Sequence, residues 1–182
     1  MNNFKDIKVV VSDVDGCLTS GEYIVSDTGS ISKSFYTRDF YTIERLLNEG
    51  IHVIILTQSN DKVINKRIEE IAKNSKYWKN CLKYRSLVLF TNVDNKFEKL
   101  KNYLTAETSC SLKDVAYIGD SENDLKCMEK CRVIGCPNDA IKSIKDIDGI
   151  YISEYDGGKG AVYDFIMYIL EKMEKNNENF RT

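Results

Sequence analysis

The sequence predicts an α/β domain built on a doubly wound parallel sheet. Short apolar runs alternate with segments of helical periodicity along almost the whole chain. The runs are apolar throughout, a pattern typical of strands that helices cover on both faces of a sheet. A chain of 182 residues is long enough to form one such domain with a buried core. We therefore expect a single domain over residues 1–176 and a polar tail over 177–182.

Six apolar runs are expected to form the strands. They are IKVVVSD (7–13), IHVIILT (51–57), SLVLFT (86–91), VAYIGD (115–120), RVIGC (132–136) and GIYIS (149–153). The helical segments between and after them are residues 39–49, 61–74, 94–105, 122–131, 138–146 and 159–175. This alternation of strand and helix favours a parallel sheet with a layer of helices on each side.

The segment between the first two strands is too short to hold a cap domain. It predicts a β-hairpin flap over about residues 20–37, in which GEYIVSD and SISKSFYTR flank the turn DTGS. The apolar residues of this flap are Tyr23, Ile24, Val25, Ile31, Phe35 and Tyr36. Since a monomer seldom leaves so much apolar surface in water, we expect the flap to pack against neighbouring subunits. A flap folded back on its own sheet is the alternative.

Composition excludes several classes of partner. The formal net charge is -2, with 42% hydrophobic and 30% charged residues, so the chain lacks the basic surface that nucleic acid requires. No apolar stretch approaches the ~20 residues of a membrane span, and the first ten residues lack the layout of a secretory signal. These features predict a cytoplasmic protein that binds neither nucleic acid nor membrane.

The cysteines and the one histidine favour structural roles. The six cysteines include no C-x-x-C pair, which favours reduced, packed thiols over disulfides or a zinc site. His52 stands between a helix stop and a strand, where a structural role is favoured over catalysis.

Carboxylates collect where the strands end. Asp13 and Asp15 close the first run, and side chains two residues apart on a strand share one face. At ~5.5 Å and an effective dielectric of ~20 they repel by roughly 3 kcal/mol, so the pair requires a cation or a proton. Asp120 ends the fourth run, and ligands of doubly wound sheets bind at this edge.

The ligand types at this edge favour magnesium. Hard oxygen donors without histidine or cysteine select Mg²⁺, which also accepts a substrate phosphate. We expect Asp13 and Asp120 to be side-chain ligands. We expect Asp124 to lie behind these ligands and hold them in position, and we expect Asn123 beside it to do the same.

These residues suit phosphoryl transfer. Asp13 can attack phosphorus to form an aspartyl-phosphate, while Asp15 protonates the leaving alkoxide and later deprotonates water. Thr57 and the backbone N–H groups after it are expected to hold the phosphoryl oxygens. Lys96 supplies the positive charge that the transition state needs.

The order of these motifs resembles the haloacid dehalogenase superfamily of phosphatases. The likeness lies in DVDGCLT (13–19), Thr57 at a strand end, Lys96, and GDSENDL (119–125), and it covers residues 7 to about 170. It implies that Asp13 is the nucleophile and Asp15 the general acid/base. It also implies that Asp15 binds the metal through its backbone carbonyl, with Asp120 as the other ligand and Thr57 and Lys96 as phosphate contacts.

Two further stretches, RDFYTIERLLNEGI (38–51) and GGKGAVYDFI (157–166), resemble the capless branch of that superfamily. This branch holds 3-deoxy-D-manno-octulosonate 8-phosphate phosphatase and the sialic-acid-type 9-phosphate phosphatases, and the resemblance implies a homotetramer with the flap at the subunit interface. The chain departs from the branch at TQS (57–59), where T-G-R is usual, and the segment 74–86 is longer than expected. By this resemblance Gln58 and Ser59 stand where the branch contacts substrate, and Gln58 is also expected to bind phosphate.

Arg38, Asp39 and Lys159 complete the candidate residues. Arg38 could bind a substrate carboxylate with both arms of its guanidinium, and Lys159 could do the same or stand at an anion-favouring helix start. Asp39 is placed to cap the helix that follows it.

The predicted function is a Mg²⁺-dependent phosphatase for a phosphorylated 2-keto-3-deoxy sugar acid. The eight-carbon 3-deoxy-D-manno-octulosonate 8-phosphate is the first choice, and an N-acylneuraminate or KDN 9-phosphate is the second. A phosphatase for another small metabolite remains open. So does a catalytically weak oligomerisation domain like those attached to acylneuraminate cytidylyltransferases. A signalling receiver domain is disfavoured, because Thr57 stands where a receiver carries its phosphorylated aspartate.

Overall fold

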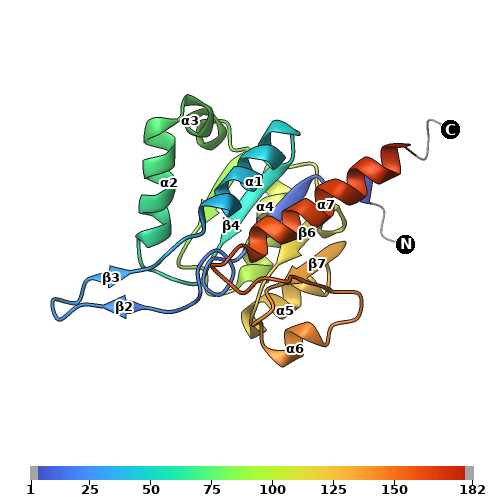
Figure 1. Ribbon diagram of the computed structural model, residues 1–182. Coiled ribbons are helices and arrows are strands. Elements are labelled where there is room, and N and C mark those ends of the chain that lie inside the picture. The colour runs from blue at the N-terminus through green and yellow to red at the C-terminus, as the bar shows by residue number, and fades with distance from the viewer. Residues whose placement is uncertain (1–3, 179–182) are drawn as a thin grey trace.

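A six-stranded parallel sheet forms the centre of the computed structural model, which describes residues 4–178 (Figure 1). The strands lie in the order β5-β4-β1-β6-β7-β8. The chain builds outward from β1 through β4 to β5 and then crosses to the other side of β1 for β6, β7 and β8. The direction of winding therefore changes beside β1, the point at which doubly wound sheets bind their ligands.

Each strand of the sheet falls inside the run predicted for it. The strands are β1 (Val9–Ser12), β4 (His52–Leu56), β5 (Leu87–Phe90), β6 (Val115–Ile118), β7 (Val133–Cys136) and β8 (Tyr151–Ile152). All five pairings between neighbours are parallel. β1 is buried along its whole length because it has a paired strand on each side and helices on both faces. The predicted doubly wound parallel sheet is confirmed.

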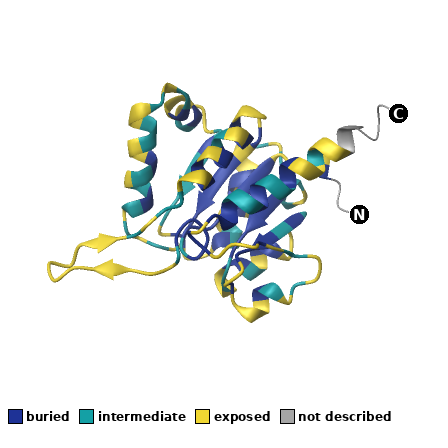
Figure 2. Ribbon diagram, viewed as in Figure 1, coloured by how far each residue is buried: buried dark blue, intermediate teal, exposed yellow. Residues whose placement is uncertain are grey.

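Helices cover both faces of the sheet. The helices are α1 (Thr37–Asn48), α2 (Val63–Asn74), α3 (Lys76–Lys83), α4 (Lys96–Glu107), α5 (Glu122–Met128), α6 (Lys142–Lys145) and α7 (Ala161–Glu178), with 3₁₀ turns at Phe4–Asp6 and Leu112–Asp114. One core cluster joins the sheet to α1, α2, α3 and α7, and a second joins it to α4, α5 and α6. Figure 2 shows the buried sheet between exposed outer helix faces. Within residues 4–178, no helix combines the length and apolar character of a membrane span.

The helices differ from the prediction in four places, and one of these is α5, which ends at Met128 and not at the predicted residue 131. α3 lies in the segment 74–86, for which no element was predicted, and it forms because Ser75 accepts a hydrogen bond from the Trp78 N–H and because Trp78 and Cys81 are buried. α6 is shorter than the predicted 138–146, since the Ile141 N–H is bonded to the Asp120 carbonyl. α7 extends to Glu178, into the predicted polar tail, and residues 179–182 of that tail lie outside the described residues.

The flap between β1 and α1 is a two-stranded antiparallel hairpin, as predicted. Its strands are β2 (Ile24–Val25) and β3 (Ile31–Ser32), and it extends away from the sheet as an arm beside the N-terminal end of α2 (Figure 1). Ile24 is 66% exposed and Val25 61% exposed, so the alternative of a flap folded back on its own sheet is wrong. The predicted contact with a neighbouring subunit stays a prediction.

Candidate active site

A pocket opens at the carboxyl ends of β1 and β4, where the sequence predicted the site. The pocket has a volume of about 320 Å³, and its lining residues are Asp13, Asp15, Tyr23, Thr57, Gln58, Ser59, Lys96, Ser121 and Asn123. These residues come from the loop after β1, the flap, the loop after β4 and the N-terminal ends of α4 and α5. The fold therefore brings most of the predicted site residues to one place.

Asp13, Lys96 and Asp124 form a buried charged cluster. The Lys96 ammonium lies 2.8 Å from Asp13 Oδ1 and 2.8 Å from Asp124 Oδ1, and none of the three side chains is more than 4% exposed. Lys96 is the first residue of α4, and Asn95 before it caps the helix by accepting from the Glu98 N–H. This cap fixes the start of α4 and thereby aims Lys96 into the pocket.

The electrostatics of the cluster follow from its burial. Burial, followed by repulsion from Asp124, raises the pKa of Asp13 well above its usual range, while Lys96 opposes the rise. Burial alone would lower the pKa of Lys96, but the charges of Asp13 and Asp124 outweigh it and raise that pKa. Lys96 therefore stays charged. The cluster has two carboxyl groups for one ammonium, so a further cation would stabilise it and favour the ionised form of Asp13.

Asp124 is held in place by four donors. Its Oδ1 accepts from the Tyr117 hydroxyl at 2.7 Å as well as from Lys96, and its Oδ2 accepts from the backbone N–H groups of Asp120 and Ser121 at 3.2 and 3.3 Å. The backbone at Gly119 passes so close to the Asp124 side chain that a Cβ added at Gly119 would lie 2.5 Å from it. Asp124 thus ties the loop after β6 to α5 and orients Asp120.

Three carboxylates are close enough to share a metal ion. One oxygen from each of Asp13, Asp120 and Asp124 lies within 4.8 Å of the others. Asp120 Oδ1 is buried and has no hydrogen-bond partner among the described residues. Burial, then repulsion from Asp124, raises the pKa of Asp120 to about 6. An all-oxygen set with an unpartnered buried carboxylate oxygen fits Mg²⁺.

The side chain of Asp15 is not part of this carboxylate set and has partners of its own. Its Oδ1 accepts from the Lys33 ammonium at 2.6 Å and from the Thr19 hydroxyl at 3.0 Å. Asp13 and Asp15 both line the pocket, as expected, although β1 ends at Ser12, before either of them. Each acid has its own lysine, and this arrangement offsets the repulsion anticipated from the sequence.

The loop after β4 forms the opposite wall of the pocket. Thr57 is buried, and its Oγ1 accepts from the Ser59 N–H at 3.0 Å. The Gln58 amide bridges the pocket, since its Nε2 donates to the Asp94 carbonyl at 3.0 Å and its Oε1 accepts from Asn123 Nδ2 at 2.7 Å. Asn123 in turn accepts from Lys96 at 3.0 Å. Gln58 and Asn123 thus link the loop after β4 to the buried cluster.

Two predicted substrate contacts lie elsewhere. The Arg38 side chain is exposed, with its guanidinium carbon 5.9 Å from the centre of the Tyr36 ring, and Lys159 is also exposed. Within the described residues, the lining of the pocket includes neither of them. Sequence reasoning missed Lys33, Asp61 and Tyr23, which meet at the mouth of the pocket. One signal was available, because Lys33 is the only basic residue of the predicted flap.

The glycines of GGKGAV pack against the loop that carries Asp15. A Cβ added at Gly157 would lie 2.0 Å from the Gly16 carbonyl oxygen, and one added at Gly158 would lie 2.6 Å from the Ser20 nitrogen. The Gly158 N–H donates to the Cys17 carbonyl at 2.9 Å. The GGKGAV stretch therefore helps to hold the loop that carries Asp15 in position.

Fold and pocket define a capless α/β phosphatase of the haloacid dehalogenase type. No family model matches the chain. It is 27% identical over 173 residues to 3-deoxy-D-manno-octulosonate 8-phosphate phosphatase of Haemophilus influenzae, a match that covers 95% of this chain and 88% of the relative. It is also 29% identical over 165 residues to N-acylneuraminate cytidylyltransferase A of Danio rerio, but this match covers only 35% of that relative.

Solved structures give the same result. The cobalt-bound deoxy-D-mannose-octulosonate 8-phosphate phosphatase of Haemophilus influenzae superimposes with a TM-score of 0.79 at 26% identity, over 94% of this chain and 92% of that one. The Moraxella catarrhalis 3-deoxy-D-manno-octulosonate 8-phosphate phosphatase, solved with magnesium ion, phosphate ion and KDO, gives a TM-score of 0.77 at 25% identity, over 97% and 95% of the two chains. The chain belongs to the haloacid dehalogenase superfamily, among the phosphatases similar to these two.

Proposed function

We propose that the chain is a Mg²⁺-dependent phosphomonoesterase that works through an aspartyl-phosphate on Asp13. The observation that carries this proposal is the pocket itself, where Asp13 and Lys96 lie 2.8 Å apart and Asp15 and Thr57 are also among the lining residues. A nucleophile, a second carboxylate, a hydroxyl and an ammonium around one small polar pocket are the groups that phosphoryl transfer needs.

The first half of the reaction transfers the phosphoryl group to Asp13. The Thr57 hydroxyl and the backbone N–H groups after it hold the phosphoryl oxygens, and Lys96 balances the charge that builds up beside the nucleophile. An Asp13 oxygen forms a bond to phosphorus, the bond from phosphorus to the ester oxygen breaks, and Asp15 gives a proton to the departing alkoxide.

The second half releases inorganic phosphate. Asp15, now a carboxylate, takes a proton from water as the water oxygen attacks phosphorus, and the bond from phosphorus to Asp13 breaks. Asp13 and Asp120, with the backbone carbonyl of Asp15, would hold Mg²⁺, and Asp124 and Asn123 would support them. When bound, the ion supplies positive charge that lowers the repulsion between the phosphoryl group and the carboxylates.

For the substrate we propose a phosphorylated 2-keto-3-deoxy sugar acid, with 3-deoxy-D-manno-octulosonate 8-phosphate first. The names of the relatives from Haemophilus influenzae and Moraxella catarrhalis support this choice, since both are phosphatases of that compound. A nine-carbon N-acylneuraminate or KDN 9-phosphate is the second choice. Gln58 and Ser59, which replace the glycine and arginine of the usual T-G-R pattern, line the pocket. They would contact the part of the substrate that differs between the eight-carbon and nine-carbon sugar acids.

A second function is favoured by the likeness to the cytidylyltransferases of Danio rerio. The chain spans 35% and 38% of the length of these two relatives, so it corresponds to one region of a longer protein there. A catalytically weak oligomerisation domain is therefore the alternative. The presence of the full set of predicted catalytic, phosphate-binding and metal-binding residues favours the enzyme; they are Asp13, Asp15, Thr57, Lys96 and Asp120.

We also propose that the chain acts in the cytoplasm as a homotetramer with the flap at the subunit interface. Support comes from the exposed apolar residues of the flap, including Tyr23 at 48% and Ile31 at 40% exposure. Light scattering at micromolar concentration tests the assembly. Ile24→Asp together with Val25→Asp should dissociate it, and a monomeric wild type would contradict it.

Phosphate release decides between the enzyme and the scaffold. Purified protein with Mg²⁺ should hydrolyse 4-nitrophenyl phosphate, and Asp13→Asn should abolish this activity while the fold survives.

A comparison of kcat/KM across sugar acid phosphates and hexose phosphates then tests the substrate class. The sugar acids should be preferred by at least ~10-fold, which corresponds to about 1.4 kcal/mol. Equal rates would remove the substrate proposal and leave the phosphatase proposal standing.

A further inference from the structure

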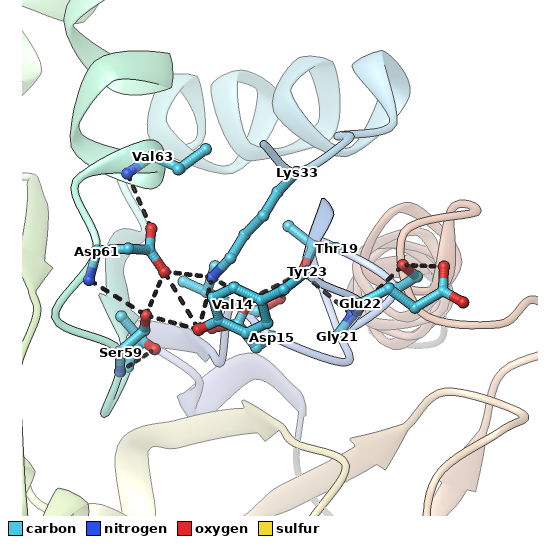
Figure 3. A network of polar contacts seen from close by, with 12 residues as sticks. Val14, Asp15, Thr19, Gly21, Glu22, Tyr23, Lys33, Ser59, Asp61 and Val63 are labelled. Carbon is cyan, nitrogen blue, oxygen red and sulfur yellow. Dashed lines mark hydrogen bonds and ion pairs between the residues drawn. The ribbon is translucent and has the colours of Figure 1, made fainter. Parts of the chain in front are cut away.

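The flap directs one buried lysine to Asp15, which lines the pocket. Lys33 follows β3 directly, and its side chain is 1% exposed. Its ammonium lies 2.6 Å from Asp15 Oδ1 and 2.5 Å from Asp61 Oδ2. It also donates to the Tyr23 hydroxyl at 3.2 Å and lies 4.3 Å from the centre of the Tyr23 ring (Figure 3). The apolar outer part of the flap is exposed, whereas its lysine is directed inward.

Lys33 binds one particular oxygen of Asp15. Both partners of the Asp15 carboxylate within the described residues, Lys33 at 2.6 Å and the Thr19 hydroxyl at 3.0 Å, contact Oδ1. A carboxylate held at one oxygen by two donors on different segments cannot rotate freely. Oδ2 is therefore left as the oxygen that can exchange a proton with a substrate.

The same lysine connects Asp15 to the loop that holds Thr57. The Ser59 N–H donates to Thr57 Oγ1 at 3.0 Å, and the Ser59 hydroxyl donates to Asp61 Oδ2, the oxygen that also accepts from Lys33. Asp61 Oδ1 accepts from the Val63 N–H at 2.9 Å and so fixes the start of α2. Figure 3 shows this path running from α2 through Asp61 and Lys33 to Asp15.

We propose that Lys33 is a positioning residue for the general acid/base of this site: it anchors Asp15 Oδ1 so that Oδ2 faces the leaving-group oxygen. The flap is then part of the catalytic apparatus of its own chain, independently of any contact it makes with another subunit. This inference rests on the proposed phosphatase function and adds to it a residue and an assigned oxygen.

The inference predicts a dependence on the leaving group. A well placed acid matters most when the departing oxygen is basic and needs a proton, and least when it leaves readily as an anion. Phenyl phosphate and 4-nitrophenyl phosphate have similar shapes and differ mainly in the basicity of the phenolate that departs. Because kcat/KM covers only the steps up to release of that phenolate, it isolates the half-reaction in which Asp15 acts as the acid.

The experiment compares kcat/KM of the two aryl phosphates for wild type, Lys33→Met and Lys33→Arg. Lys33→Met should lower kcat/KM for phenyl phosphate by about 10- to 100-fold and for 4-nitrophenyl phosphate by no more than about 3-fold, since general acid catalysis contributes on the order of 10²-fold or more. Lys33→Arg, which keeps a cation on the flap, should recover most of the loss. Lys62→Met is the matched control, because Lys62 is exposed beside the flap and carries the same charge.

Each outcome bears on the inference. Equal losses on both substrates, or no loss on either, would overturn it while an active wild type leaves the phosphatase proposal intact. A wild type without phosphatase activity would overturn both. If Lys33→Met fails to fold by circular dichroism, Asp61→Asn carries the test, since it keeps the cap on Val63 but weakens the hold on Lys33. Asp61→Asn should also lose more kcat/KM on phenyl phosphate than on 4-nitrophenyl phosphate, but by a smaller factor than Lys33→Met. Equal losses on the two substrates in this variant would count against the inference.

Discussion

Lys96 and Asp13 form a buried ion pair, with Nζ and Oδ1 2.8 Å apart and side chains 1% and 4% exposed. Replacing Lys96 by methionine would leave Asp13 and Asp124 buried without their shared cation. Removing one partner of a buried pair costs about 3–5 kcal/mol, so Lys96→Met should lower the free energy of unfolding in EDTA by that amount. It should also lower kcat by about 100-fold or more, because the charge beside the nucleophile is lost.

Urea unfolding and steady-state kinetics check both effects. Lys101→Met is the control, since Lys101 is exposed on the same helix and its loss should change neither quantity measurably. A Lys96→Met protein as stable and as active as wild type would show that the pair has no role in the site.

Magnesium should stabilise the folded chain through the carboxylates at the end of β1 and β6. A ligand that binds only the folded state adds about 2.7 kcal/mol at one hundred times its Kd, so Tm should rise with Mg²⁺ concentration. In Asp120→Asn this rise should shrink markedly, because a neutral amide replaces the carboxylate whose unpartnered oxygen would bind the ion, and the negative charge of the ligand is lost. Differential scanning calorimetry measures the shift. Glu122→Gln, an exposed acid two residues away, should respond to Mg²⁺ like wild type, and an unchanged response in Asp120→Asn would place the ion elsewhere.

Gly157 should tolerate no side chain. An alanine Cβ at this position would lie 2.0 Å from the Gly16 carbonyl oxygen, a contact that only a backbone shift can relieve. Gly157→Ala should therefore destabilise the chain by about 1–3 kcal/mol and displace the loop that carries Asp15, with a loss of activity. Gly149→Ala is the control for stability alone, because its left-handed φ of +74° adds strain without any neighbour within 4 Å. Gly157→Ala with normal activity would mean that the loop is positioned independently.

The sequence predicted the sheet well because burial on both faces leaves a direct signal. The residues of β1, Val9 to Ser12, are all buried, and such continuous apolar runs are hard to mistake for anything but inner strands. α3 was missed because it is only eight residues long, so that its apolar spacing covers little more than two turns, and because it is stabilised by packing against α1 and α2.

The site was most predictable where functional residues stand at strand ends. Asp13 and Thr57 follow β1 and β4 directly and Asp120 is the second residue after β6, so topology brings them together. Lys33 and Asp61 lie on the flap and on the loop before α2, and their meeting depends on how the hairpin crosses the pocket. That path depends on side-chain contacts over a long sequence separation, which no local pattern encodes.

Asp39 is a second residue whose contacts could not be predicted from the local sequence. It was expected to cap α1, but Tyr36 occupies the cap position and Asp39 lies buried in the first turn. Its Oδ1 accepts from the Tyr163 N–H of α7 at 2.8 Å, and its Oδ2 is buried without a partner among the described residues. Asp39 therefore joins two helices that are far apart in the sequence.

This buried carboxyl should make stability depend on pH. Burial raises the pKa of Asp39 to about 7, with the Tyr163 N–H opposing, whereas an unfolded aspartate titrates near ~3.9. The folded chain thus holds the Asp39 proton more tightly, and the stability it contributes is present below the unfolded pKa and is lost as pH rises through about 7. The free energy of unfolding should then fall with pH by up to about 1.4 kcal/mol per pH unit between these two pKa values.

Urea unfolding in EDTA from pH 5 to 8 should show a smaller decline in the free energy of unfolding for Asp39→Asn than for wild type. Exposed Asp148→Asn should follow wild type, and equal slopes for Asp39→Asn and wild type would mean that Asp39 stays ionised in the fold.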